Sequence, residues 1–131
     1  MSRHEAVQMA EKYLAFVDFP LSLDTCAYEL NTIQLKKLEL ARVLSTECNL
    51  LLLDEVAAGL TSGELDDIAN LIRKMRDSMS ITIIIVEHLM KLIMGVCNRI
   101  AVLYYGEKLA EGTPAEITAH PEVIKAYLGE N

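Results

Sequence analysis

The sequence is poor in basic residues relative to acidic ones. It has 12 lysines and arginines against 19 aspartates and glutamates, which gives a formal net charge of −7 at pH 7. Nucleic-acid backbones are bound by clustered lysine and arginine side chains, so this balance disfavours a nucleic acid as the main partner. Apolar residues make up 52% of the 131 residues and charged residues 24%, as in a single globular domain with a modest core.

Long apolar runs are also lacking. No stretch approaches the roughly 18 apolar residues of a membrane-spanning helix, and the first five residues carry no signal-peptide apolar region. We therefore expect no direct membrane insertion, so that any membrane is met through another protein. The three cysteines show no Cys-x-x-Cys spacing, and their odd number at apolar-looking positions favours reduced thiols in a cytosolic protein; they are Cys26, Cys48 and Cys97.

Four consecutive leucines, Leu50 to Leu53, lead directly into two acids, Asp54 and Glu55. A short apolar run of this kind predicts a strand that is buried on both faces. Acids at the carboxyl end of such a strand lie where open α/β sheets bind ligands. The alternative is a buried strand or helix turn followed by an exposed acidic loop, and these residues alone do not separate the two interpretations.

A second apolar segment, Ile81 to Val86, is rich in β-branched residues and predicts another buried strand, which ends at Glu87 and His88. Between the two strands, Thr61 and Glu64 fit a capping box that begins an amphipathic helix. Its apolar stripe comprises Leu65, Ile68, Leu71, Ile72, Met75 and Met79. Alternating strands and helices are typical of a parallel sheet, so the predicted fold class is α/β.

Helical patterns precede these segments. Apolar residues at spacings of three and four predict a helix from Arg3 to Val17. Asn31 and Gln34 fit a second capping box, and the helix that follows runs to about Leu44 and is expected to bury Leu35, Leu38, Ala41 and Leu44.

The segments after His88 predict smaller elements. A helix from Leu89 to Met94 is expected to stop at Gly95, and a hairpin is expected to turn at Gly106. Thr113, Pro114 and Glu116 predict a capped helix, and Pro121 begins a last helix that ends at Gly129. The strands of the hairpin are expected at Arg99 to Tyr104 and Glu107 to Glu111.

The order of these motifs resembles the ATP-binding subunits of ABC transporters. The leucine run that ends at Asp54 and Glu55 resembles the Walker B strand, residues 58–61 the D-loop, and His88 the switch histidine. The resemblance implies a partial P-loop NTPase fold of the RecA-like type, a parallel sheet flanked by helices. It further implies that Asp54 helps to hold Mg²⁺, that Glu55 polarises the attacking water, and that His88 senses the γ-phosphate of ATP.

Several segments are similar to one subfamily, the ATPases of branched-chain amino acid importers. The resemblance implies that residues 1–46 are a remnant of the helical subdomain and residues 47–131 the carboxyl-terminal half of the nucleotide-binding core. It implies a second nucleotide-binding subunit in a homo- or heterodimer, and membrane permease subunits at the cytoplasmic face. The segments are Glu87–His88, Lys91–Met94, Val102–Gly106, Ala110–Pro114 and Val123–Glu130.

Two departures from the family pattern concern phosphate binding. None of the six glycines is followed by lysine, so the Gly-x-x-x-x-Gly-Lys cradle of a P-loop is absent from the sequence. The family signature Leu-Ser-Gly-Gly-Gln is replaced by Leu30, Asn31, Thr32, Ile33 and Gln34. A β-branched side chain in place of glycine obstructs a close approach to phosphate. The resemblance therefore makes residues 31–34 a degenerate contact to ATP held by the opposite subunit.

Two functional interpretations remain open. The chain is half of an importer ATPase that is inactive alone, or it is a non-catalytic remnant or interaction module that pairs with a nucleotide-binding subunit. In the family, the strand that leads into the P-loop separates the strands at Ile81–Val86 and Arg99–Tyr104. Since this chain lacks that strand, we expect the two to pair directly, to recruit a strand from a second molecule, or to leave the chain marginally stable.

Overall fold

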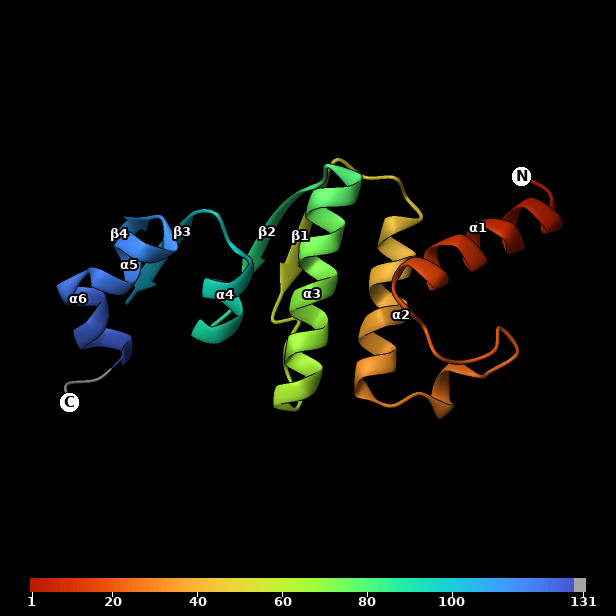
Figure 1. The fold of residues 1–131 in the computed structure, drawn as a ribbon, viewed down its shortest axis with the longest axis horizontal. Helices are drawn as coiled ribbons and strands as arrows, with labels where there is room; N and C mark the ends of the chain where they lie inside the picture. The colour runs from red at the N-terminus through yellow and green to blue at the C-terminus, as the bar shows by residue number, and fades with distance from the viewer. Residues whose placement is uncertain (129–131) are drawn as a thin grey trace. The chain divides into compact units, whose positions relative to one another are not determined.

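Three α-helices and two parallel strands make up the first part of the computed structural model, which describes residues 1–128 (Figure 1). The chain divides into two compact units, Met1–His88 and the residues from Leu89 onward. The elements of the first unit are α1 (Arg3–Phe16), a 3-10 turn η1 (Ala27–Glu29), α2 (Thr32–Leu44), β1 (Leu50–Asp54), α3 (Ser62–Met79) and β2 (Thr82–Val86).

Both capping boxes predicted in this unit are confirmed. At α2, the Asn31 side chain accepts a hydrogen bond from the Gln34 N–H at 3.0 Å, and the Gln34 side chain accepts one from the Asn31 N–H at 3.0 Å. Thr61 and Glu64 make the same reciprocal pair at the start of α3. Each box satisfies two backbone donors that the first turn of a helix leaves without a partner, which is why the sequence alone locates these helix starts.

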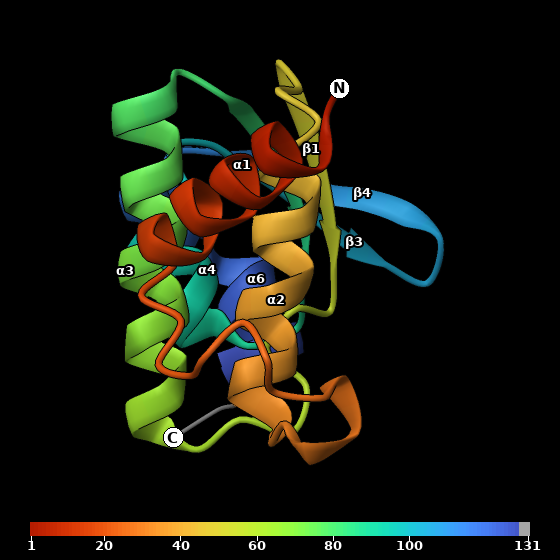
Figure 2. The ribbon, with the colours of Figure 1, turned by 90° about the vertical axis from the view of Figure 1, so that its right-hand side faces the viewer.

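The strands β1 and β2 are parallel, as predicted. Their register pairs Leu50 with Thr82 and ends with Asp54 opposite Val86. Helix α3 lies across one face of this strand pair (Figures 1 and 2). The covered side is the core of the unit, formed by Leu51 and Leu53 of β1 and by Leu65, Ile68, Leu71, Ile72 and Met75 of α3, all of them buried.

The prediction that both strands are buried on two faces is wrong. Leu50 and Leu52 of β1 are 52% and 67% exposed, and Ile84 and Val86 of β2 are 53% and 61% exposed. Side chains alternate between the two faces of a strand, and α3 covers only one of them. The apolar run is therefore half open to solvent within the described residues. Leu35 on α2, which was also expected to be buried, is 40% exposed.

The second unit contains a hairpin between short helices. Its elements are α4 (Met90–Val96), β3 (Ile100–Tyr104), β4 (Glu107–Gly112), α5 (Pro114–Ala119), α6 (Pro121–Val123) and a π-helical turn η2 (Ile124–Leu128). The strands β3 and β4 pair antiparallel, and the turn between them has positive φ at Tyr105 and Gly106. The hairpin and the Thr113 cap of α5 are confirmed. Gly95 does not stop α4, which continues to Val96, and Gly129 lies outside the described residues.

Ion pairs centred on Glu111 lie toward the end of the hairpin that is away from its turn. Arg99 Nε lies 2.9 Å from a carboxylate oxygen of Glu111, and Lys108 Nζ lies 2.7 Å from the other. The hydrogen bonds from Lys108 and from Arg99 hold the pKa of the Glu111 carboxyl below its usual value. These groups are exposed, so the pairs contribute little to the stability of the unit.

The strands β2 and β3 belong to different sheets, each of two strands. β2 pairs with β1 inside the first unit, and β3 pairs with β4 inside the second. Direct pairing of β2 with β3, recruitment of a strand from another molecule and marginal stability all stay predictions.

Two other sequence predictions concern the surface. Among the described residues, no helix combines the length and the apolar character that crossing a membrane requires. The three cysteines are free thiols, but Cys26 is exposed and therefore does not lie at an apolar position.

We expect Ile68→Ala to destabilise the first unit strongly. Ile68 is fully buried at 0% exposure, and its truncation leaves a cavity in the core under α3. The free energy of unfolding should fall by about 2–5 kcal/mol in urea denaturation followed by circular dichroism. The control is Val7→Ala on α1, where the side chain is 40% exposed and the change should stay within about 0.5 kcal/mol. Equal effects of the two substitutions would contradict the packing described for α3.

Candidate functional site

The carboxyl ends of β1 and β2 meet at one edge of the parallel pair. Asp54 lies opposite Val86, and the N–H of Glu55 donates to the carbonyl of Val86 at 2.9 Å. The two acids that end β1 therefore lie beside Glu87 and His88, which follow β2. The structure thus brings together three of the residues that the sequence proposes for chemistry, from positions more than thirty residues apart.

Asp54 is the last residue of β1 and shares its exposed face with Leu50 and Leu52. The described residues contain no group of three or more histidine, cysteine, aspartate or glutamate side chains that could hold a metal ion. Mg²⁺ is commonly held by one or two carboxylates together with phosphate oxygens and water, so Asp54 fits a magnesium ligand without such a group.

Glu55 begins the loop between β1 and α3 with a left-handed backbone, at φ of +50°. The N–H of Ala58 donates to its carbonyl at 3.3 Å, so the chain turns directly after the strand. Such backbone is unfavourable for a residue with a side chain and is frequent at functional sites. Four other non-glycine residues in the described part of the chain share it, namely Asp18, Glu47, Ser80 and Tyr105, so the strain alone assigns no function to Glu55.

Glu87 is a site residue that sequence reasoning missed. Its side chain is 1% exposed, and Oε1 accepts a hydrogen bond from the N–H of Ala57 at 2.8 Å. Oε2 accepts from the N–H of His88 at 3.3 Å. The carboxylate thus ties the end of β2 to the loop that carries Glu55, across thirty residues of sequence. In the sequence, the position of Glu87 next to His88 was the available signal for a role in the site. Its hydrogen-bond partner, Ala57, could not be found this way, because the contact depends on the register of the strands.

His88 lies on the outside of this edge. Its side chain is 69% exposed, and its Nδ1 is 3.9 Å from Oε2 of Glu87, which is beyond hydrogen-bond distance. The imidazole is therefore accessible to a ligand that approaches the edge of the sheet.

The segment from Asn31 to Gln34 begins α2 and lies next to the loop after β1. Thr32 of this segment lies close to Gly59 in that loop: a Cβ atom placed on Gly59 would be 3.5 Å from Cγ2 of Thr32. The side chains of Asn31 and Gln34 are occupied with each other's backbone amides. The four residues therefore form a capped helix start, in which the two polar side chains that could reach a ligand serve the helix instead.

A hollow of about 460 Å³ runs between α2 and β1 and ends at Asp54. Its walls are both apolar and charged. From α2 come Lys36, Glu39, Leu40, Arg42 and Val43, followed by Thr46, and from β1 and the loop after it come Leu51, Leu52, Leu53, Asp54 and Val56. The hollow therefore joins the basic edge of α2 to the acidic end of β1.

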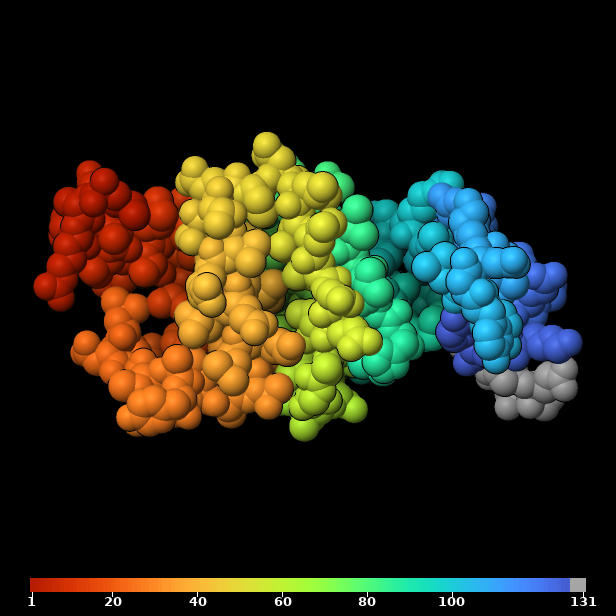
Figure 3. Space-filling view, turned by 180° about the vertical axis from the view of Figure 1, so that it is seen from behind, coloured from red at the N-terminus to blue at the C-terminus, as the bar shows by residue number. Residues whose placement is uncertain are grey.

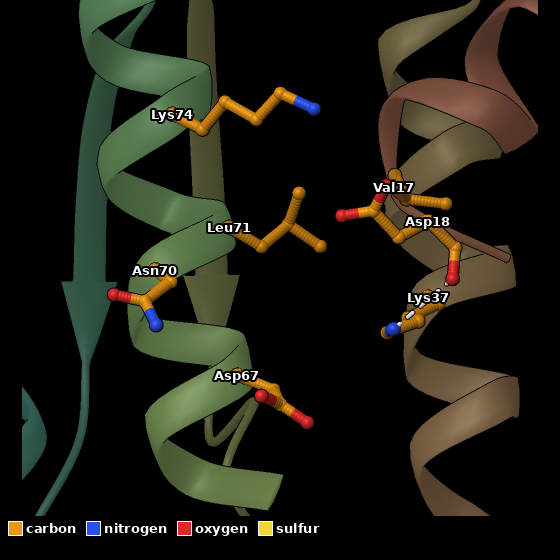
Figure 4. Close-up of a pocket in the computed structure, with 7 residues that line it drawn as sticks. All are labelled: Val17, Asp18, Lys37, Asp67, Asn70, Leu71 and Lys74. Atoms are coloured by element: carbon orange, nitrogen blue, oxygen red, sulfur yellow. Dashed lines mark hydrogen bonds between the residues drawn. The ribbon is translucent and has the colours of Figure 1, made fainter.

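A second hollow, of about 360 Å³, lies between α3 and the end of α1 with α2 (Figure 4). Both of its lysines serve the packing of helices. Lys37 donates to the carbonyl of Asp18 at 3.2 Å, and Lys74 donates to the carbonyl of Phe16 at 2.7 Å. Lys74 also lies 4.2 Å from the centre of the Phe16 ring. We therefore assign this hollow to the contact between helices and not to a ligand.

Comparison with known proteins shows one consistent similarity. Residues 107–131 match a family model described as "Branched-chain amino acid ATP-binding cassette transporter". The chain is 42% identical, over 129 residues, to the high-affinity branched-chain amino acid transport ATP-binding protein BraF of Pseudomonas aeruginosa, a match that covers 98% of the chain and 51% of BraF. The corresponding protein LivG of Escherichia coli is 46% identical over 95 residues, covering 72% of the chain and 37% of LivG.

Solved structures of ABC transporter components resemble this chain in fold. The ADP conformation of MJ1267, an ATP-binding cassette of an ABC transporter, matches with a TM-score of 0.85 at 29% identity, covering 99% of this chain and 52% of that one. The structure of cbiO1 from Clostridium perfringens, part of the ABC transporter complex cbiONQ, matches with a TM-score of 0.83 at 29% identity, covering 95% and 50%. The match to BraF includes nearly all of this chain but only 51% of BraF, so this chain spans about half the length of that relative.

We expect Glu87→Ala to loosen the loop after β1. The substitution leaves the N–H of Ala57 buried without an acceptor, and the free energy of unfolding of the first unit should fall by about 1–3 kcal/mol. The amide of Ala57 should also exchange with solvent faster, as measured by hydrogen exchange. Glu87→Gln is the matched control, because its side-chain oxygen can still accept from Ala57. A loss of the same size in both variants would show that this hydrogen bond is not what holds the loop.

Proposed function

We propose that this chain supplies one half of the ATP-hydrolysing unit of an importer. The premise is its family: the chain belongs to the ATP-binding subunits of ABC transporters. It corresponds to the carboxyl-terminal part of those subunits that take part in branched-chain amino acid import. The observation that carries the proposal is the register of β1 and β2. It sets Asp54 and Glu55 beside Glu87 and His88 at a single edge of the sheet.

In this proposal, each side chain at the edge has one task. The Asp54 carboxylate would hold Mg²⁺ together with oxygen ligands from ATP and water. Glu55 orients and polarises the attacking water, and the exposed imidazole of His88 contacts the γ-phosphate. When bound, the metal ion supplies neutralisation of the charge on the phosphates. Glu87 positions the loop of Glu55 through the N–H of Ala57 and does not touch the nucleotide.

The chain lacks the Gly-x-x-x-x-Gly-Lys cradle, so it places neither the triphosphate nor the nucleophile unaided. Positioning supplies most of the catalysis in phosphoryl transfer, and the isolated chain should therefore be inactive. The proposed assembly includes a second nucleotide-binding subunit and membrane permease subunits at the cytoplasmic face. Residues 1–46 then belong to the helical subdomain and residues 47–131 to the nucleotide-binding core.

A second candidate is an interaction module that pairs with a nucleotide-binding subunit and does no chemistry. The altered signature favours it. Ile33 and Thr32 stand where the family has glycine, and Asn31 and Gln34 are committed to the cap of α2. The two candidates differ in whether Glu55 and residues 31–33 affect ATP hydrolysis.

The first test concerns Glu55. The chain alone should show no significant ATPase activity. A fusion in which the half of BraF that this chain does not match precedes Met1 should hydrolyse ATP, since the phosphate cradle is then present. Glu55→Gln in the fusion should lower the rate by about 10²–10⁴-fold through loss of the general base. Glu11→Gln, an exposed acid on α1, is the control and should leave the rate unchanged. Equal activity of the Glu55→Gln fusion and the unsubstituted fusion would disprove the assignment.

The second test restores the family signature by combining Asn31→Ser, Thr32→Gly and Ile33→Gly. In a mixed dimer with a complete ATP-binding subunit of this family, the restored chain should raise the rate of ATP hydrolysis, because backbone can then approach the partner's nucleotide. Serine keeps the helix cap, and each glycine costs at most about 1 kcal/mol in the first turn of α2. The single change Asn31→Ser is the control. An unchanged rate with all three substitutions would favour the interaction module.

A further inference from the structure

We propose that Glu87 links His88 to the loop after β1, so that a ligand on the imidazole of His88 changes the position of Glu55. Glu87 acts here as a positioning residue and touches no ligand itself. The proposal rests on the proposed function, which gives the γ-phosphate to His88 and the attacking water to Glu55. It adds a coupling between these two residues inside a single chain.

The link is one buried carboxylate whose two oxygens serve two segments of the site. Oε1 of Glu87 accepts a hydrogen bond from the N–H of Ala57 at 2.8 Å, and Oε2 accepts one from the N–H of His88 at 3.3 Å. The Glu87 side chain is 1% exposed, so water does not readily replace a lost donor. Because both oxygens belong to one planar group, a displacement of the His88 amide turns the carboxylate or breaks a hydrogen bond, and either change reaches Ala57.

The loop after β1 carries a change at Ala57 to Glu55 because it consists of tight turns. The N–H of Ala58 donates to the carbonyl of Glu55 at 3.3 Å, and the N–H of Leu60 donates to the carbonyl of Ala57 at 3.3 Å. The backbone is left-handed at both Glu55 and Gly59, with φ of +50° and +78°. A short segment fixed by such bonds transmits displacement along its length, so Ala57 and Glu55 move together.

The loop is attached to the end of β2 at two points of different kinds. At the first, the N–H of Glu55 donates to the carbonyl of Val86 at 2.9 Å, which continues the pairing of β1 with β2. At the second, Ala57 is held by the side chain of Glu87. The backbone bond stays with the sheet, whereas the side-chain bond can change, so a change at Glu87 turns the loop about Glu55.

Both ends of this link face solvent, although the carboxylate between them does not. The imidazole of His88 is 69% exposed, and a ligand can reach it directly. In the loop, Ala58 and Gly59 are exposed, so the outer part of the loop has room to move. Seen from behind, the yellow-green segment that begins at the end of β1 lies at the surface (Figure 3).

A simpler role for Glu87 would be to satisfy the amide of Ala57 and nothing more. Glutamine separates this role from the coupling, because its side chain has a single oxygen and its NH₂ group cannot accept a hydrogen bond. The bond to Ala57 is the shorter of the two, so the glutamine oxygen should remain with Ala57. Glu87→Gln therefore keeps the loop attached and removes the link to His88.

The first test measures amide exchange in the whole chain by NMR. In Glu87→Gln, the His88 amide should exchange at least about threefold faster, while the Ala57 amide stays within about twofold of the unsubstituted chain. In Glu87→Ala, both amides should exchange faster. Glu11→Gln, the same change at an exposed acid of α1, is the control and should alter neither amide. Unchanged exchange at His88 in Glu87→Gln would overturn the link.

The second test adds a ligand, using the fusion with the half of BraF that this chain does not match. A non-hydrolysable ATP analogue with Mg²⁺ should slow the exchange of the Ala57 and Leu60 amides at least about threefold. His88→Ala and Glu87→Gln should each remove most of this slowing. Glu87→Gln should also lower kcat for ATP hydrolysis with little change in KM, which a loop that is merely attached would not show. Slowing that survives Glu87→Gln would overturn the coupling.

The outcomes distinguish the coupling from the proposed function on which it rests. A fusion that binds no nucleotide counts against the proposed function and against a phosphate ligand on His88, and amide exchange in the chain alone still decides whether Glu87 links His88 to Ala57. A fusion that hydrolyses ATP, and whose loop responds to the analogue equally with and without Glu87→Gln, supports the roles of Glu55 and His88 and overturns the coupling.

Discussion

The parallel pairing of β1 with β2 is the constraint on which the rest of the first unit depends. It runs for five residue pairs, from Leu50 opposite Thr82 to Asp54 opposite Val86. Because the strands are parallel, their carboxyl ends meet, and the polar residues that follow them share one edge. A shift of the register by one residue would move Glu87 away from Ala57 and would exchange the covered and open faces of β2.

Local features of this fold could be predicted from the sequence because their causes lie within a few residues. The capping boxes of α2 and α3 join residues three apart, and the stripe of α3 needs only its own periodicity. The burial of the strands could not be predicted in the same way. The leucine run shows that its side chains avoid water, but nothing in it tells whether the cover lies in this chain. Leu52 and Ile84 are exposed because the described residues cover only the opposite face.

The residues of the candidate site show the same difference between local features and features that depend on distant residues. Asp54, Glu55 and His88 were proposed from the order of motifs, and the register places them at one edge. Glu87 was not proposed, because its acceptor role depends on Ala57, thirty residues earlier, and on the depth at which the carboxylate is buried. A buried carboxylate needs donors, and the backbone N–H of a loop supplies one without a second charge. A contact of this kind becomes visible only when the pairing of the strands is known.

The acidic edge at the end of β1 and the start of α2 differ in whether their polar side chains are available to a nucleotide. The edge at Asp54 and Glu55 keeps acidic side chains that face solvent or a ligand, and Glu87 holds the loop that carries them. The start of α2 instead uses its polar side chains for the helix itself, since Asn31 and Gln34 bind each other's amides and Thr32 packs near Gly59. A branched side chain directly after the cap keeps the backbone at a distance from a ligand. Residues 31–34 thus form a local structure at the start of α2, while the strand-end carboxylates remain exposed.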